Sequence, residues 1–192
     1  MHDHLTGRGR SREQAGVEAL VVQGAEAGGH QSSWDDIDNA PVPLLPLLRL
    51  VTEVTDKPAV ATGGIATGAA VRAVLDAGAA AAQIGSGLLL AHEAGTSEPH
   101  RAALAGDAPT ALTRAFTGRR ARGIVNRFLR EHDAEAPKAY PHVHYLTAPL
   151  RAAARNAGDP GGINLWAGEA YRLAEARPAG ELVRRWAADC RS

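Results

Sequence analysis

VEALVVQGAEAGGH, residues 17–30, is the stretch that decides which fold this sequence predicts. It begins as an apolar run, passes through Gln23, and ends in two glycines followed by His30. Apolar residues on both faces are typical of a strand in a parallel sheet. We therefore predict a buried strand over 17–23 that ends in a glycine-rich loop bearing one titratable side chain. Such loops at strand ends are where α/β proteins build their sites.

Two later stretches repeat this pattern of an apolar run followed by glycines. PAVATGGI at 58–65 predicts a second strand over 58–62, and AAAQIGSG at 80–87 predicts a third over 80–84. Helical spacing of apolar residues predicts the intervening helices. Their expected ranges are 44–56 and 67–77, the second capped by Thr67. The alternating order with short links predicts a parallel sheet with right-handed crossovers.

The remaining segments carry weaker patterns. Residues 24–43 form a long loop of the kind that is usually functional or mobile. After the third strand, helices are expected over 88–92, 98–105, 128–134, 150–157, 165–176 and 181–188. An extended segment is expected over 112–116, a basic turn over 117–126 and an irregular segment over 136–149.

Length and composition exclude several classes of protein. The chain has 192 residues, enough for one domain, and a formal net charge of zero. This charge gives no electrostatic case for nucleic acid or an anionic membrane as the partner. Cys190 is the single cysteine, which rules out an intramolecular disulfide. Without an apolar membrane span or a secretory signal, we expect a cytoplasmic protein with a disordered tail over 1–14 and a domain over 15–192.

The glycines at the second and third strand ends indicate an anion site. Backbone N–H groups of Gly63, Gly64, Gly85 and Ser86 would attract a phosphate, as after the last strands of (β/α)8 barrels. The alternative interpretation is that each is an ordinary tight turn.

His30 is the candidate general base, because an imidazole exchanges protons near neutral pH. The alternative is an exposed loop histidine. Gln23 could bind a ligand carbonyl or ring nitrogen, or cap the sheet, and Glu26 could be a second base or a solvated acid.

Other titratable clusters give weaker hypotheses. The pairs His2/His4 and His142/His144 lack the cysteine or acid spacing of known metal sites, so we predict no metal. The arginines at 119, 120 and 122 could hold an anion or form a solvated turn or lid.

Several motifs together resemble the nitronate monooxygenases, FMN-dependent enzymes formerly called 2-nitropropane dioxygenases. They are QGAEAGGH at 23–30, ATGGIATG at 61–68, AQIGSGLL at 82–89, TRAFTGRRARGIVNRF at 113–128 and LWAGEAYRLA at 165–174. The resemblance implies a partial (β/α)8 TIM barrel, comprising about the last three βα units, followed by C-terminal helices.

The same resemblance implies roles for individual residues. Gly63, Gly64, Gly85 and Ser86 would bind the FMN phosphate, Gln23 would lie beside the flavin, and Gly28 and Gly29 would complete the cofactor site. His30 would be the catalytic base that takes the α-proton of a nitroalkane. The substrates would be a nitroalkane or alkyl nitronate and O2.

Two alternatives remain open at this point. FMN-dependent enoyl-acyl-carrier-protein reductases have a similar EAGGH segment, but tend to have Glu-Gly where this chain has Gln23-Gly24. The other alternative is a catalytically silent fragment. A full barrel needs about 250 residues, and the strand at 17–23 would be its sixth. We therefore expect the C-terminal part of a family member, with an uncovered sheet edge that could self-associate.

Overall fold

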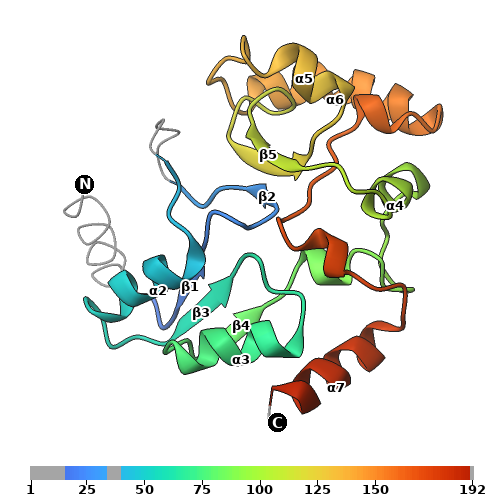
Figure 1. Ribbon diagram of the computed structural model, residues 1–192. Helices are drawn as coiled ribbons and strands as arrows, with labels where there is room; N and C mark the ends of the chain where they lie inside the picture. The colour runs from blue at the N-terminus through green and yellow to red at the C-terminus, as the bar shows by residue number, and fades with distance from the viewer. Residues whose placement is uncertain (1–15, 34–39, 191–192) are drawn as a thin grey trace.

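Three parallel strands form the sheet that the sequence predicted. The structure is a computed structural model that describes residues 16–33 and 40–190, so the expected disordered tail lies outside the described residues. The strands are β1 (Leu20–Gln23), β3 (Ala59–Thr62) and β4 (Ala81–Gln83), in the order β1-β3-β4. Gln23 pairs with Thr62, and Thr62 with Gln83, so the three carboxyl ends lie level at one edge (Figure 1).

Helices α2 (Leu44–Thr52) and α3 (Gly68–Asp76) cover one face of this sheet (Figure 1). The buried core between them consists of Val22, Leu44, Leu48, Ala59, Ala61, Ile65, Val74 and Ala79. Thr67 caps α3 as predicted, because its side-chain oxygen accepts a hydrogen bond from the Ala70 N–H at 3.1 Å. Gly78 follows the helix with φ +101°, the conformation typical of a helix end.

The opposite face of the sheet is open in the described structure. Val21 is 47% exposed, whereas its neighbours Leu20 and Val22 are buried. Val21 pairs with Val60, which pairs with Ala81, an exposed residue. The prediction that β1 is buried on both faces is therefore wrong for the described residues, because helices cover only one side.

A second sheet was not predicted. It consists of β2 (Gly29–His30), β6 (Ala121–Ile124) and β5 (Thr110–Thr113), antiparallel and in that order. The predicted basic turn over 117–126 is therefore partly wrong, since β6 is buried at every residue. Burial of Arg122 is possible because its guanidinium donates to the Ala25 carbonyl at 2.9 Å and pairs with Glu169 at 3.1 Å.

The remaining helices follow the prediction in part. They are α4 (Glu98–Leu104), α5 (Arg127–His132), α6 (His142–Asn156) and α7 (Ala179–Asp189), with 3-10 turns η1 (Ser86–Leu88), η2 (Pro160–Gly162) and η3 (Tyr171–Leu173). Helix α6 begins well before the predicted 150 and contains Pro149. The predicted helix over 88–92 is replaced by η1, and the one over 165–176 by an irregular segment with η3. Residue Trp166 instead forms a β-bridge with Gly123.

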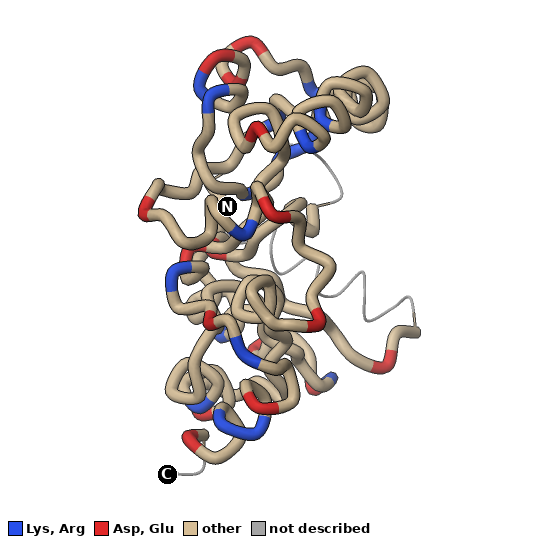
Figure 2. Tube along the Cα trace, turned by 90° about the vertical axis from the view of Figure 1, so that its right-hand side faces the viewer, with Lys and Arg blue, Asp and Glu red and all other residues tan. Residues whose placement is uncertain are grey.

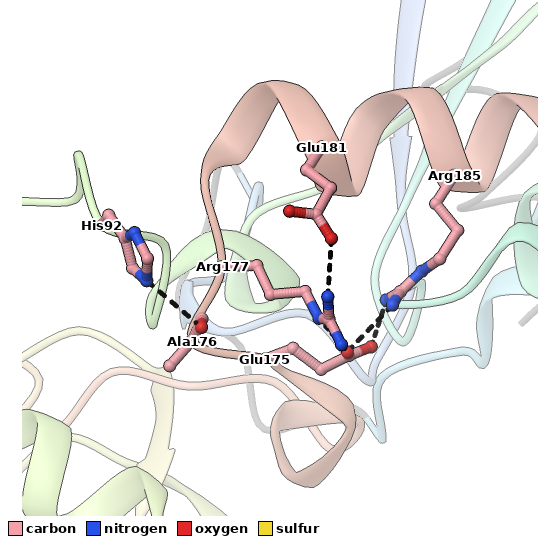
Figure 3. A network of polar contacts seen from close by, with 6 residues as sticks. All are labelled: His92, Glu175, Ala176, Arg177, Glu181 and Arg185. Atoms are coloured by element: carbon pink, nitrogen blue, oxygen red, sulfur yellow. Dashed lines mark hydrogen bonds and ion pairs between the residues drawn. The ribbon is translucent and has the colours of Figure 1, made fainter.

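A network of ion pairs holds the segment that leads into α7 (Figure 3). Arg177 and Arg185 both bind the Glu175 carboxylate, and Arg177 also binds Glu181 at 2.6 Å. The hydrogen bond and charge of Arg185, followed by those of Arg177, lower the pKa of Glu175. His92 contacts the Ala176 carbonyl at 3.2 Å, which joins this segment to the loop after η1. The network connects the loop after η1 with the segment before α7, and it does not involve the ends of the parallel strands.

Charge is distributed without a dominant sign over the described chain. Figure 2 shows acidic and basic residues interspersed along the trace, in agreement with the formal net charge of zero. None of the helices in the described ranges is long and apolar enough to cross a membrane.

Candidate functional site

The loops after β1 and β3 lie against each other at the carboxyl edge of the parallel sheet. Gly63 has φ +115°, and a Cβ added there would lie 3.1 Å from the Ala27 nitrogen. Gly64 has φ +69°, and its added Cβ would lie 3.2 Å from the Glu26 Cβ. Left-handed backbone and close approach both favour glycine at these two positions. The structure therefore brings the first two predicted strand ends together.

A segment from the far end of the chain joins the loops after β1 and β4. The Gly168 N–H donates to Ser86 Oγ at 2.8 Å, and the Glu169 N–H donates to the Glu26 carbonyl at 3.0 Å. A Cβ added at Gly28 would lie 2.5 Å from the Gly168 nitrogen, so Gly28 allows this contact. Sequence reasoning missed Gly168 because it assigned the segment to a helix. A glycine within that expected helix was the available signal.

Backbone donors remain at the ends of β3 and β4. No described residue accepts a hydrogen bond from the N–H groups of Gly64, Ile65, Gly85 or Ser86. A Cβ added at Gly85 would meet nothing within 4 Å, so the space beside it is open. N–H groups without an acceptor at two adjacent strand ends, with open space beside Gly85, fit an anion such as a phosphate.

His30 lies on β2 beside these loops, with its ring among aromatic side chains. Its Nε2 atom is 2.9 Å from Thr117 Oγ1. The ring centroid lies 5.7 Å from that of Tyr140 and 5.8 Å from that of Trp166. His30 is therefore partly buried and oriented, unlike the exposed loop histidine of the alternative interpretation. The aromatic neighbours and Thr117 lie far along the chain, so no local pattern could have revealed them.

The surroundings of His30 favour its neutral form. Loss of solvent lowers the pKa of His30 below its ordinary value, and the positive charge of Arg119 and the neighbouring His144 lower it further. A neutral imidazole carries one N–H and one lone pair. The ring can therefore accept a proton at neutral pH, as a general base must.

Gln23 holds the backbone of the His30 loop. Its Nε2 donates to the His30 carbonyl at 3.1 Å, and its Oε1 accepts from the Ser32 N–H at 2.6 Å. An amide group has two N–H donors, so one remains for a ligand. Gly29, with φ +75° and open space beside it, allows the chain to turn into β2.

Glu26 and the arginines act as structural contacts. Both carboxylate oxygens of Glu26 accept from the Leu44 N–H, at 3.0 and 3.1 Å, so Glu26 caps α2. Arg119 donates to the carbonyls of Gln31 and Ser33 at 3.1 and 2.6 Å. With Arg122 bound to Ala25 and Glu169, at least these two arginines of the basic segment brace loops. These contacts do not support the hypotheses of a second base at Glu26 or an anion held by the arginine cluster.

The histidine pairs show no metal-binding arrangement in the described ranges. There, no group of three or more His, Cys, Asp or Glu side chains lies close enough to hold a metal ion. His144 contacts the Arg151 guanidinium at 3.2 Å, and His2 and His4 lie outside the described residues.

Comparison with known proteins identifies relatives over nearly the whole chain. The model of the nitronate monooxygenase family matches residues 8–189. A probable nitronate monooxygenase of Staphylococcus aureus (strain Newman) is 37% identical over 181 residues, which are 90% of this chain and 50% of that protein. The chain thus spans about half the length of the curated relatives it matches.

Solved structures share the fold. Crystal structures of nitroalkane oxidase from Streptomyces ansochromogenes match with a TM-score of 0.95 and 51% identity, over 97% of this chain and 55% of that chain. FabK from Thermotoga maritima matches with a TM-score of 0.80 over 97% of this chain and 58% of that chain. Its 22% identity makes this a likeness of fold alone. By its motifs, the family model and these relatives, the chain belongs to the nitronate monooxygenase family.

Proposed function

We propose that this chain is the C-terminal part of a (β/α)8 flavoenzyme that oxidises nitroalkanes or alkyl nitronates with O2. The observation that carries the proposal is that the loops after three glycine-bearing strands lie together, and that the first of these loops leads into His30, whose imidazole is partly buried. In this proposal β1, β3 and β4 correspond to the sixth, seventh and eighth barrel strands. Open faces of the described sheet are consistent with a barrel completed by further strands.

The cofactor of the proposal is FMN. Backbone N–H groups at Gly64, Gly85 and Ser86 would hold its phosphate, with Gly63 providing the turn. Gln23 would use its remaining N–H toward the flavin ring, and Gly28 and Gly29 would let backbone approach it. When bound, the flavin supplies the two-electron acceptor that O2 reoxidises.

His30 acts as the general base in this proposal. It takes the α-proton of a neutral nitroalkane, whereas a nitronate has already lost that proton. Its lowered pKa keeps the imidazole neutral and able to accept the proton at neutral pH. Burial beside Tyr140 and Trp166 limits the access of water to the ring.

Flavin binding is tested with Gly85→Val in the 192-residue chain. The Gly85 backbone is ordinary for other residues, at φ −107°, and a side chain there enters open space that we assign to the phosphate. We expect the wild type to retain FMN and the variant to lose at least tenfold in FMN affinity without loss of fold, measured by flavin absorption and equilibrium dialysis. Gly95→Val is the matched control, because Gly95 also faces open space. A colourless wild type would support the silent-fragment alternative instead.

The base is tested with His30→Gln and paired substrates. Loss of a general base costs about 10²–10⁴-fold in rate, so nitroalkane oxidation should fall by that factor while nitronate oxidation changes only a few-fold. His132→Gln, an exposed histidine on α5, is the control. Equal losses of rate for the nitroalkane and the nitronate would contradict the role of His30 as general base. Turnover of an enoyl thioester with NAD(P)H, in place of nitro compounds, would favour the enoyl-acyl-carrier-protein reductase alternative.

A further inference from the structure

We infer that Thr117 is a positioning residue that holds His30 as its Nε2–H tautomer and leaves Nδ1 as the basic atom. Thr117 lies 87 residues from His30 in the chain and contacts it at 2.9 Å. The tautomer follows from the hydrogen bonds of the described structure. Its importance for catalysis rests on the proposed function of His30 as a base.

The direction of the Thr117–His30 hydrogen bond follows from the other bonds of the same hydroxyl. Thr117 Oγ1 lies 3.1 Å from the Arg119 carbonyl, which can only accept, so the single hydroxyl proton is directed there. The Arg119 N–H approaches the same oxygen at 3.4 Å as a further donor. Toward His30, Thr117 Oγ1 is therefore an acceptor, and His30 Nε2 must carry the proton.

The hydroxyl is held in place by a buried turn. Thr117 is 1% exposed, so water does not compete for its bonds. The N–H groups of Thr117 and Gly118 both donate to the Arg114 carbonyl, at 3.2 and 2.8 Å. Gly118 has φ +77°, and a Cβ there would lie 2.7 Å from the carbonyl carbon of Ala139. This packing fixes the acceptor in one position relative to β2.

The imidazole is also fixed from its own backbone. Gln23 binds the His30 carbonyl at 3.1 Å, and β2 pairs His30 with Ala121 of β6. A neutral imidazole with its proton on Nε2 has its only lone pair on Nδ1. Because Thr117 accepts a hydrogen bond from Nε2, it determines that Nδ1 is the basic nitrogen of His30. Hydrogen-bond partners of histidine fix the tautomer in the same way in other sites.

The tautomer is tested by NMR of the 15N-histidine-labelled 192-residue chain at neutral pH, which requires neither flavin nor turnover. We expect long-range 1H–15N correlations to assign the His30 proton to Nε2, with a ring N–H signal protected from solvent exchange. Thr117→Val removes the acceptor at nearly constant volume, and this protection should be lost. Thr117→Ser keeps the hydroxyl and should keep the protected signal. A proton on Nδ1 of the wild type, or unchanged protection in Thr117→Val, would overturn the inference.

Kinetics test the consequence separately. Thr117→Val should lower nitroalkane kcat by about 10–100-fold, the size of effect seen when a metal-ligating histidine loses the partner that orients it, while nitronate oxidation stays within a few-fold. Thr117→Ser should restore most of the loss. A Nε2–H signal in a protein without nitroalkane oxidation would contradict the proposed function and leave the tautomer assignment in place. Should Thr117→Val fail to fold, the wild-type and serine spectra still decide the tautomer.

Discussion

The imidazole of His30 is partly buried beside Tyr140 and Trp166, and this loss of solvent penalises its charged form. The positive charge of Arg119, on the loop before β6, and the neighbouring His144, on α6, lower the pKa of His30 further. Each effect lowers the pKa of His30 and favours the neutral ring. A residue that was identified in the sequence as one titratable group in a glycine-rich loop thus obtains its chemistry from distant neighbours.

At the scale of this residue we predict a pKa below the ordinary histidine value of about 6.5. NMR titration of the His30 ring should show this, and Arg119→Gln should raise the pKa because it removes the second-largest cause of the shift. Arg49→Gln, an exposed arginine on α2, is the control and should leave the pKa unchanged. A titration at or above 6.5 would contradict the assigned environment.

The same shift has a consequence for stability. Because the folded-state pKa lies below the unfolded value, the unfolded chain binds more protons between the two pKa values. The contribution of His30 to the free energy of unfolding is therefore complete above about pH 6.5 and is lost as the pH falls below it. His100, whose pKa burial also lowers, acts in the same direction.

The strands and helices of the parallel sheet could be predicted from the sequence because their patterns are local. The strands over 58–62 and 80–84 and the capped helix after Thr67 match β3, β4 and α3 closely. Each depends on apolar spacing and turn residues within a few positions. By contrast, β6 was missed because the arginine-rich segment around it predicted a basic turn, although Arg122 is buried through its contacts with Ala25 and Glu169.

At the scale of the element we predict that Thr67→Ala destabilises the protein by about 1 kcal/mol, within a range of about 0.5–2 kcal/mol for lost helix caps. The Ala70 N–H would lose its acceptor at the start of α3. Urea unfolding followed by circular dichroism measures the change. Thr67→Ser retains the oxygen and should stay within about 0.5 kcal/mol of the wild type. An alanine variant as stable as the wild type would refute the cap.

At the scale of the whole molecule, the parallel and the antiparallel sheet are connected to each other (Figure 1). The antiparallel sheet connects to the parallel one through β2 and through the Arg122 contacts. The parallel sheet leaves Val21 47% exposed on its open face, and β1 has no second strand partner among the described residues. Uncovered edges and apolar faces of this kind favour association with another chain.

We therefore predict concentration-dependent self-association of the 192-residue chain. Val21→Glu places a charge on the open face and should lower the association constant at least severalfold, measured by sedimentation velocity over a range of concentrations. Val183→Glu is the matched control, because Val183 is 52% exposed on α7, a helix that packs against α3. A wild type that is monomeric at every concentration would contradict this expectation.

Local sequence was sufficient for the parallel strands, their order and their glycine-bearing ends, and it selected His30 as a candidate. Those features depend on periodicity and turn chemistry among neighbouring residues. The partners that define the site came from folding alone: Thr117 and Gly168 reach their contacts with His30 and Ser86 across long stretches of chain. No one-dimensional pattern records such contacts, because they depend on how separate elements pack. For the same physical reason, the sequence left the role of Arg122 open, whereas the fold buries it as a contact between the loop after β1 and Glu169.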